Sequence, residues 1–87
     1  MRSIFEKVGE NIRFMRQMQG ISVEEAAWQA DIDPAYWSSI ERGGRNITLL
    51  TLHIIADAMH IETYELLMQP HQLKEKYHCH SRKASNK

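Results

Sequence analysis

The sequence predicts an all-α domain of five helices, and three features of the chain lead to this prediction. Apolar residues recur three and four positions apart in several stretches, as they do on one face of an amphipathic helix. Residues that commonly cap helices stand just before those stretches, and no stretch shows the alternating pattern of a β-strand. The chain has 87 residues, of which 43% are hydrophobic and 25% charged, so one small globular domain is expected.

The N-terminal half is expected to hold three helices. An amphipathic helix begins near Ile4 and should stop near Gly20, because glycine commonly follows a helix end. Ser22 stands at the start of a capping box and predicts a second, short helix. Asp33 is followed by proline, which is a further start signal, so a third helix is predicted over about residues 34–42.

Two more helices are expected before Pro70. Thr48 should cap a fourth helix, whose inner face is predicted to consist of Leu49, Leu52, Ile55, Ala56 and Met59. A fifth should open at Glu62 or Thr63 and end before Pro70, because proline pushes the preceding residue out of helical geometry. Since nothing after Pro70 has a strong apolar period, residues 70–87 are predicted to be a basic, polar and partly disordered tail.

The formal net charge is zero, which taken alone argues against a nucleic-acid binder, because such proteins usually carry an excess of bases. The charge is divided unevenly along the chain. Residues 1–69 hold six Lys and Arg against ten Asp and Glu, a net −4, whereas residues 70–87 hold five against one, a net +4. The sequence therefore predicts an acidic helical domain over residues 1–69 and a basic tail after it.

The single cysteine, Cys79, cannot form an internal disulfide, and this usage fits a reducing cytoplasm. No apolar run approaches the roughly 18–20 residues that a membrane helix needs. The N-terminal stretch carries acids where an export signal would be apolar. We therefore expect a cytoplasmic protein without a membrane segment or an export signal.

Two short helices joined by a three-residue turn, within about residues 22–42, have the layout of a helix-turn-helix unit, whose second helix enters the DNA major groove. The chain also resembles the XRE family of phage-repressor and Cro-like regulators in residues 8–16, 20–22, 36–46, 51–52 and 55–59. This resemblance covers about residues 8–67 and implies a five-helix, lambda-repressor-like, DNA-binding domain. The loop after Asn46, which lacks a proline, is similar to that of restriction–modification controller proteins, although this second resemblance is weaker.

The resemblance implies roles for side chains around the third helix. Arg16 matches the arginine that pairs with a glutamate late in the recognition helix, here Glu41, and the pair would lock the first helix to the third. Trp37 and Ile40 would point inward. The positions that face DNA bases in the family correspond here to Pro34, Ala35, Ser38 and Ser39.

These base-facing residues are poor in groups that discriminate between bases. Specific contacts usually come from Arg, Asn or Gln, and each is worth about 1–3 kcal/mol. Pro34 and Ala35 offer no such bond, although Ala35 could touch a thymine methyl, and Ser38 and Ser39 discriminate little. Sequence specificity is therefore expected to come largely from DNA shape, water or half-site spacing.

Phosphate contacts are expected around the recognition helix. Tyr36 is a candidate for a backbone phosphate contact, and Arg42, Arg45 and the amide of Asn46 flank the C-terminus of the helix. The alternative for each arginine is a solvated surface charge without a functional partner.

A subset of apolar residues exceeds what the core of five helices needs. Leu50 and Ile54 lie off the inner stripe of the fourth helix, and the fifth adds Tyr64 and Met68. Together they would form an exposed patch of the kind that marks protein contacts. A twofold dimer through these helices would place two recognition helices about one DNA turn, ~34 Å, apart. The alternative is that these residues cover the edge of the core.

The tail contains His78, Cys79 and His80, which are residue types that bind zinc or copper. Adjacent ligands fit one tetrahedral ion poorly, so no metal site is predicted and the histidines are taken as incidental. A further interpretation is a basic arm that attracts DNA phosphates; it would consist of Lys74, Lys76, Arg82, Lys83 and Lys87.

The sequence shows no Gly-rich phosphate loop, carboxylate pair or nucleophile–base set, so neither an enzyme nor a cofactor is expected. The predicted function is sequence-specific regulation of transcription by a homodimer that binds a palindromic operator in double-stranded DNA. Residues 34–42 would be the recognition helix. The alternative is a protein-interaction module on the same fold, with a protein partner and weak or no DNA binding, since a fold alone does not decide function.

Overall fold

The computed structural model describes the backbone of residues 3–85 and the side chains of residues 3–77. Within this part of the chain every regular element is a helix, as the sequence predicts. The elements in chain order are α1 (Ile4–Met18), α2 (Val23–Ala30), α3 (Pro34–Glu41), α4 (Leu49–Ala58), the 3-10 helix η1 (Thr63–Leu67) and α5 (Pro70–Ser85).

Each of the first four α-helices starts at a polar side chain that bonds to the backbone of the first turn. Ser3 caps α1 in this way, and Ser22 Oγ accepts from the N–H of Glu25 at 3.0 Å before α2. Asp33 and Thr48 do the same before α3 and α4. These bonds satisfy amides that the first helical turn leaves unpaired, which is why capping residues in the sequence locate the starts correctly.

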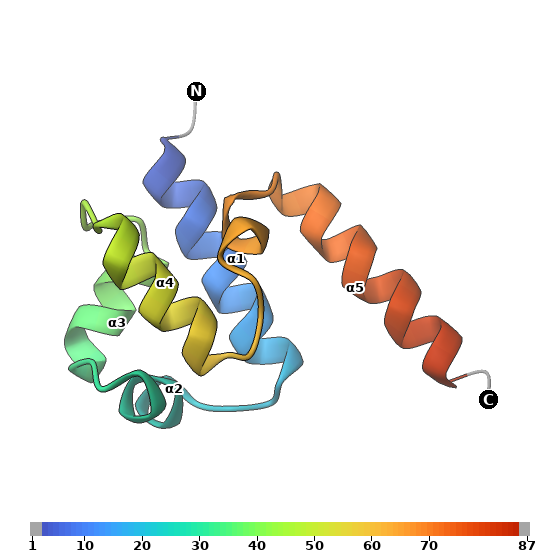
Figure 1. The fold of residues 1–87 in the computed structure, drawn as a ribbon, viewed down its shortest axis with the longest axis horizontal. Helices are drawn as coiled ribbons and strands as arrows, with labels where there is room; N and C mark the ends of the chain where they lie inside the picture. Colours follow the sequence, from blue (N-terminus) through green and yellow to red (C-terminus); the bar gives the residue numbers. More distant parts are fainter. Residues whose placement is uncertain (1–2, 86–87) are drawn as a thin grey trace.

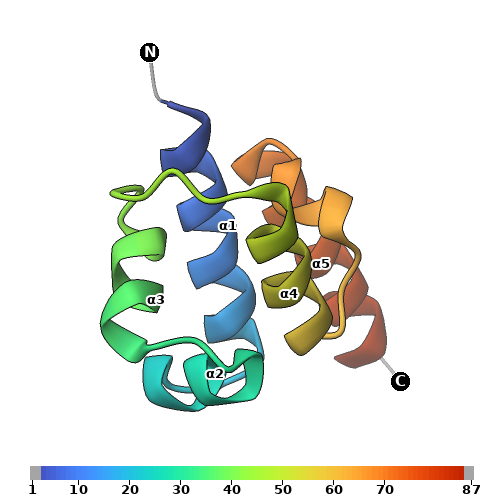
Figure 2. The same cartoon turned by 60° about the vertical axis from the view of Figure 1, so that its left-hand side comes forward.

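α1 runs through the middle of the domain (Figures 1 and 2). α3 packs on one side of it, η1 and α5 pack on another, and α2 closes one end by packing against α3 and α4. The shared core is apolar and takes residues from every helix: Val8, Ile12, Met15, Ala26, Ala27, Ala30, Trp37, Ile40, Leu52, Ile55, Ala56, Met59, Leu66 and Leu73.

The structure differs from the sequence prediction on both sides of Pro70: the helix predicted to open at Glu62 or Thr63 is present only as a short 3-10 helix, and the backbone from Pro70 is helical where a polar tail was predicted. Residues 63–67 form only the 3-10 turn η1, and the fifth α-helix begins at Pro70 itself. Proline suits the first position of a helix, because its fixed φ is helical and an amide there would have no intrahelical partner. Leu73, with none of its surface exposed, fixes the start of α5 against the domain together with buried Pro70.

Polar contacts also hold the start of α5 to the domain. Lys74 Nζ donates to Glu10 Oε2 at 2.8 Å, and Lys76 Nζ donates to Glu65 Oε2 at 2.8 Å. The Tyr77 hydroxyl donates to the same Glu65 carboxylate. The first two turns of α5 therefore belong to the folded domain. These contacts join residues on both sides of the domain boundary that was predicted after residue 69.

Asn11 is a buried polar residue whose role the sequence does not reveal. It is 1% exposed, and its Nδ2 donates to the carbonyls of Leu66 at 3.0 Å and Met68 at 2.8 Å. Because a 3-10 turn leaves its last carbonyls without helical partners, this amide satisfies two of them and fastens η1 to α1.

The inner face predicted for α4 needs one correction. Leu52, Ile55 and Met59 are buried, but Leu49 is 73% exposed. As the first residue of α4, it lies where the helix emerges from the loop. The periodic pattern is compatible with burial there, but Leu49 instead lines an open pocket beside Ile4 and Phe5 of α1 and Leu67 of η1.

Candidate nucleic-acid interface

α2, a short turn and α3 form a compact unit at one end of the domain (Figure 2). α2 ends at Asp31, which has a left-handed conformation with φ 58°. Asp33 then begins α3, and its carboxylate accepts from the N–H groups of Ala35 and Tyr36 at 3.0 and 3.3 Å. Asn and Asp tolerate left-handed geometry better than other non-glycine residues, so the sequence of this turn favours an abrupt change of direction between the two helices.

α3 presents a small, polar outer face. Ala35 is exposed, Ser38 and Ser39 are half-buried, and Trp37 and Ile40 lie in the core. This division matches the inward and outward positions predicted for the helix. Among the described residues the outer face of α3 carries no side chain that could make a paired hydrogen bond to a base edge.

The hydroxyl of Ser39 is held in the structure. It donates to the carbonyl of Ala35 at 3.1 Å, and Arg42 Nη2 lies 3.5 Å from it as a donor. A DNA contact by Ser39 would therefore use the hydroxyl as an acceptor or require this local bond to break.

Positive charge collects where α3 ends. Arg42, Arg45 and Asn46 are all exposed in the loop between α3 and α4. The guanidinium of Arg45 lies over the ring of Tyr36, 5.3 Å from its centroid, which is a cation–π geometry. The structure thus brings together Tyr36 and Arg45, two of the residues predicted to contact phosphates.

The helix-turn-helix unit itself is acidic. Residues 17–41 contain five Asp and Glu and no Lys or Arg. Arg42 and Arg45 therefore supply the positive charge next to α3 in the chain, with Arg13 across from its C-terminal end on α1. Any attraction to phosphates near α3 must come from these few arginines, because long-range attraction follows the local charge.

The predicted pair of Arg16 and Glu41 forms part of a larger network. Arg16 Nε donates to Glu41 Oε2 at 2.7 Å, Arg16 Nη2 donates to Oε1 at 3.2 Å, and Arg16 Nη1 donates to the carbonyl of Ile21 at 3.0 Å. Trp37 Nε1 donates to the same carboxylate at 2.6 Å, and Arg13 Nε lies 3.4 Å from it. These contacts lock α1 to the C-terminal end of α3, as predicted.

The protonation of this network follows from its contacts. Burial acts to raise the pKa of Glu41, but the hydrogen bonds from Arg16, Trp37 and Arg13 and the charge of Arg16 outweigh it, so the pKa is lowered. The hydrogen bond to Glu41 likewise raises the pKa of Arg16. Sequence reasoning missed Trp37 and Arg13, although the spacing of four between Trp37 and Glu41 on one helix was a signal for the first.

Comparison with known proteins identifies this arrangement. The family model HTH_3, described as Helix-turn-helix, matches residues 12–66. The chain belongs to the XRE-like helix-turn-helix family. This is a family of DNA-binding transcription regulators, and the resemblance on which the sequence analysis relied is confirmed.

Relatives of this helix-turn-helix protein include regulators and controller proteins. It is 37% identical over 60 residues to an uncharacterized HTH-type transcriptional regulator of Sinorhizobium fredii, covering 69% of this chain and 78% of the relative. It is 38% identical over 64 residues to the control protein C.SmaI of Serratia marcescens, covering 74% and 76%. The weaker resemblance to controller proteins therefore also holds.

Solved structures agree with this assignment. A hypothetical transcription factor from Neisseria has a TM-score of 0.77 at 33% identity, with 80% of each chain covered. The restriction-modification controller protein C.AhdI from Aeromonas hydrophila has a TM-score of 0.69 at 35% identity, covering 71% of this chain and 94% of that one. The controller protein C.Esp1396I, solved as a tetramer with its 35 base-pair operator, has a TM-score of 0.70 at 28% identity, covering 77% and 92%.

The helix-turn-helix protein exposes much of the apolar patch predicted on its fourth and fifth helices. Leu50 is 67% exposed, Tyr64 58% and Ile54 39%, whereas Met68 is half-buried and packs against the core. Leu49 and Leu67 are exposed as well. We call the exposed set, Leu49, Leu50, Ile54, Tyr64 and Leu67, the apolar patch.

The remaining candidates contribute little to this interface. His53 Nδ1 lies 3.1 Å from Thr63 Oγ1, a contact between α4 and η1. The side chains of residues 78–80 lie outside those described, and the described part of the chain contains no group of three or more His, Cys, Asp or Glu that could hold a metal ion. Within that same part, no helix is long and apolar enough to span a membrane.

Proposed function

We propose that the protein regulates transcription by binding a palindromic operator as a homodimer, with α3 of each copy in the major groove. The observation that carries this proposal is the geometry of α3: a small outer face over Ala35, Ser38 and Ser39, flanked at its C-terminal end by exposed Arg42 and Arg45. Such a face lets the helix approach bases closely, while the arginines hold phosphates beside the groove.

We divide the site into residues that position the protein on the DNA backbone and residues that contact bases. We assign Tyr36, Arg42, Arg45 and Asn46 to the DNA backbone, because they surround the end of α3. Ala35 and Ser38 are assigned to base edges or thymine methyl groups. Because these contacts discriminate weakly, the spacing of two half-sites on a dimer and the deformability of the DNA between them would supply much of the specificity.

The second candidate function is a protein-interaction module with weak or no DNA binding. The acidic composition of residues 17–41, with five acids and no base, favours it, because acids beside the groove repel phosphates. The two candidates differ in whether the chain retains any specific DNA, and that can be tested directly.

The test is selection of binding sites from a random DNA pool, followed by gel-shift titration at two salt concentrations. The proposal predicts a selected sequence with twofold symmetry and salt-sensitive binding. Arg45→Gln should weaken binding by about tenfold for all sequences and lower the salt slope by about one for each phosphate that Arg45 neutralises. Lys7→Gln, which removes the same charge at a residue of α1 outside the proposed phosphate contacts, is the control and should leave the slope unchanged. Failure to enrich any site would favour the interaction module.

A further inference from the structure

Lys76, in the second turn of α5, lies among three side chains that face it. Its Nζ donates to Glu65 Oε2 at 2.8 Å and lies 3.5 Å from the hydroxyl of Tyr64 as a donor. The same ammonium lies over two aromatic rings, 5.5 Å from the centroid of Tyr64 and 5.7 Å from that of Tyr77. We call these four residues, Tyr64, Glu65, Lys76 and Tyr77, the Lys76 cluster.

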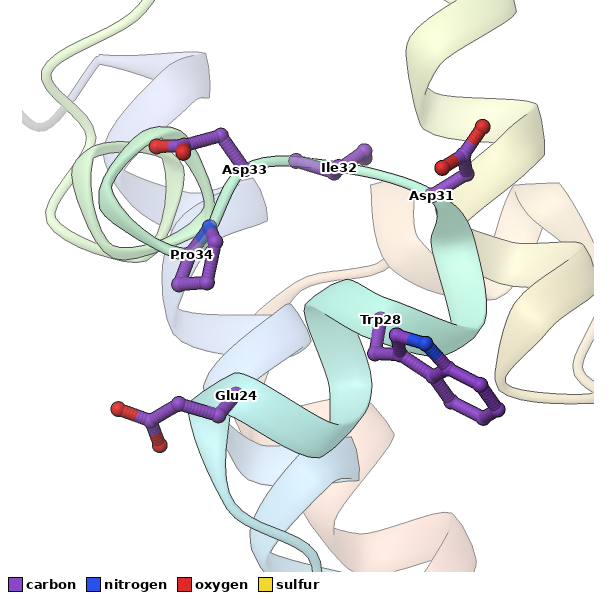
Figure 3. Close-up of a pocket in the computed structure, with 6 residues that line it drawn as sticks. All are labelled: Glu24, Trp28, Asp31, Ile32, Asp33 and Pro34. Atoms are coloured by element: carbon purple, nitrogen blue, oxygen red, sulfur yellow. The ribbon is translucent and has the colours of Figure 1, made fainter.

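The side chains of the Lys76 cluster converge, whereas those around the exposed Trp28 of α2 do not. The pocket beside Trp28 is also lined by Glu24, Asp31 and Asp33. Their carboxylates point to different sides and away from the indole (Figure 3). They do not meet at one ligand, so the pocket supports no binding site.

The charges of the Lys76 cluster follow from its contacts. The hydrogen bond to Glu65 raises the pKa of Lys76. Burial, together with the hydrogen bond to Glu65, raises the pKa of Tyr77 to about 12. At neutral pH Lys76 is therefore an ammonium and Tyr77 a neutral phenol, so the contact of Lys76 with the ring of Tyr64 is a cation–π contact.

The cluster links a buried anchor to an exposed surface. Glu65 has 5% of its side chain exposed, and Tyr77 packs against the core. Tyr64, by contrast, is 58% exposed and belongs to the apolar patch. A side chain that is already held before it meets a partner loses less conformational entropy on binding. Lys76 holds the ring of Tyr64 in this way.

Tyr64 lies at the edge of the α4 face that carries much of the apolar patch. η1 packs against α4. His53 follows Leu50 by three residues on α4, and its Nδ1 lies 3.1 Å from Oγ1 of Thr63, the residue before Tyr64. The ring that Lys76 holds is therefore part of the surface on which the proposed dimer depends.

We propose that Lys76 is a positioning residue for dimerisation, because it holds the ring of Tyr64 in the orientation that a second copy of the chain meets. This inference rests on the proposed homodimer and adds a requirement to it. Since Lys76 belongs to α5, the dimer reaches its full affinity only when the first two turns of α5 are docked on η1. α5 would then support operator binding without touching DNA, since only a dimer binds two half-sites together.

The test compares two lysines of α5 in the full chain by sedimentation at several concentrations. Lys76→Gln should raise the Kd of the dimer by about tenfold, because a twofold dimer contains the contact twice. Lys74→Gln is the matched control. It removes the same charge from the same helix and breaks an ion pair of the same length, 2.8 Å, to Glu10 of α1, which is outside the apolar patch. It should leave the Kd nearly unchanged.

Further variants separate positioning from stability. Urea unfolding of each variant measures the loss of stability by itself. Lys76→Arg keeps a cation that can lie over the ring of Tyr64 and should restore most of the dimer affinity. Tyr64→Leu removes the ring, so Lys76→Gln added to it should weaken the dimer no further. If Lys76 acted only on the stability of the domain, the two effects would add.

The role of Lys76 is contradicted if Lys76→Gln and Lys74→Gln change the Kd equally, or if the effects of Lys76→Gln and Tyr64→Leu add. Leu50→Glu tests the dimer itself. If Leu50→Glu weakens the dimer while Lys76→Gln acts like its control, the homodimer stands and only the role of Lys76 is lost. If the natural chain sediments as a monomer at high micromolar concentration, both the homodimer and the role of Lys76 are overturned.

Discussion

Trp37 donates from its indole Nε1 to Oε2 of Glu41 at 2.6 Å, one helical turn further along α3. The same oxygen accepts from Nε of Arg16 on α1 at 2.7 Å. One carboxylate with 2% of its side chain exposed therefore satisfies both the core tryptophan of α3 and the arginine that holds α1. This single side chain therefore joins α3 to α1.

Glu41→Gln is expected to destabilise the protein by about 2–4 kcal/mol, since it leaves the arginine partly uncompensated and one donor mispaired. Urea unfolding followed by circular dichroism measures the change. Glu25→Gln, at an exposed residue of α2, is the control and should change stability by less than about 0.5 kcal/mol. Equal effects of the two changes would mean that the network contributes nothing specific.

The network around Glu41 also makes the stability of the fold depend on pH in the acidic range. Burial acts to raise the pKa of Glu41, but its hydrogen bonds and the charge of Arg16 lower the pKa overall. Burial also acts to raise the pKa of Glu65. Hydrogen bonds from Lys76, Tyr77 and the amide of Glu62, with the charge of Lys76, outweigh burial and lower that pKa. A carboxyl group whose folded pKa is depressed stabilises the fold above its unfolded pKa, near 4.5, and this contribution is lost as the pH falls through the folded pKa.

The free energy of unfolding should therefore fall as the pH is lowered from about 6 to about 3, with a shallower slope in Glu41→Gln and in Glu65→Gln. Denaturant titrations at a series of pH values give these slopes. A slope that is unchanged in both variants would contradict the assignment, because it would have to come from other carboxyl groups.

Gly9 lies where the backbones of α1 and the end of α3 come close together. A Cβ at this residue would lie 2.5 Å from the carbonyl oxygens of both Ile40 and Glu41. Backbone atoms cannot move aside easily, so Gly9→Ala should cost at least about 2 kcal/mol and shift α3 relative to α1. Gly44→Ala is the matched control, since the nearest atom to its Cβ, the carbonyl oxygen of Ser39, would be 3.5 Å away. A thermal-unfolding midpoint that falls equally in both would contradict this close packing.

The parts of the fold that local chemistry determines could be predicted from the sequence. Ser22, Asp33 and Thr48 locate helix starts because a capping side chain bonds within its own first turn. The inward positions of Trp37 and Ile40 follow from the helical period within α3. In each case the residues involved lie within a few positions of one another.

The parts that were missed depend on residues far apart in the chain. The burial of Leu73 depends on a partner surface of α1 and η1, and nothing near Leu73 in the sequence marks it. Asn11 meets the carbonyl of Leu66 across 55 positions. The exposure of Leu49 and Trp28 likewise depends on which faces of α4 and α2 remain without a neighbour, which a periodic pattern does not specify.

A substitution at Leu73 can test whether α5 belongs to the domain. Its side chain is fully buried, so Leu73→Ala should destabilise the whole protein by about 2–5 kcal/mol. Gln72→Ala, at the exposed neighbouring residue, is the control and should have little effect. If α5 were an independent tail, Leu73→Ala would leave the unfolding midpoint unchanged. The measurement is urea unfolding, with the tryptophan emission of the core as the signal.

Substitutions in the apolar patch can test the proposed dimer. Leu50 and Ile54 lie four residues apart on α4 and are 67% and 39% exposed, so a charge at either residue is compatible with the folded monomer but would be buried in a twofold contact. Leu50→Glu and Ile54→Glu should therefore weaken dimerisation by at least about tenfold, because each places two like charges at the interface. Sedimentation at several concentrations measures the effect, and Gln17→Glu, which adds the same charge at an exposed residue of α1, serves as the control. If the natural chain is monomeric at high micromolar concentration, and neither Leu50→Glu nor Ile54→Glu changes its sedimentation, this dimer is ruled out. DNA binding would then have to be explained by single copies on single half-sites.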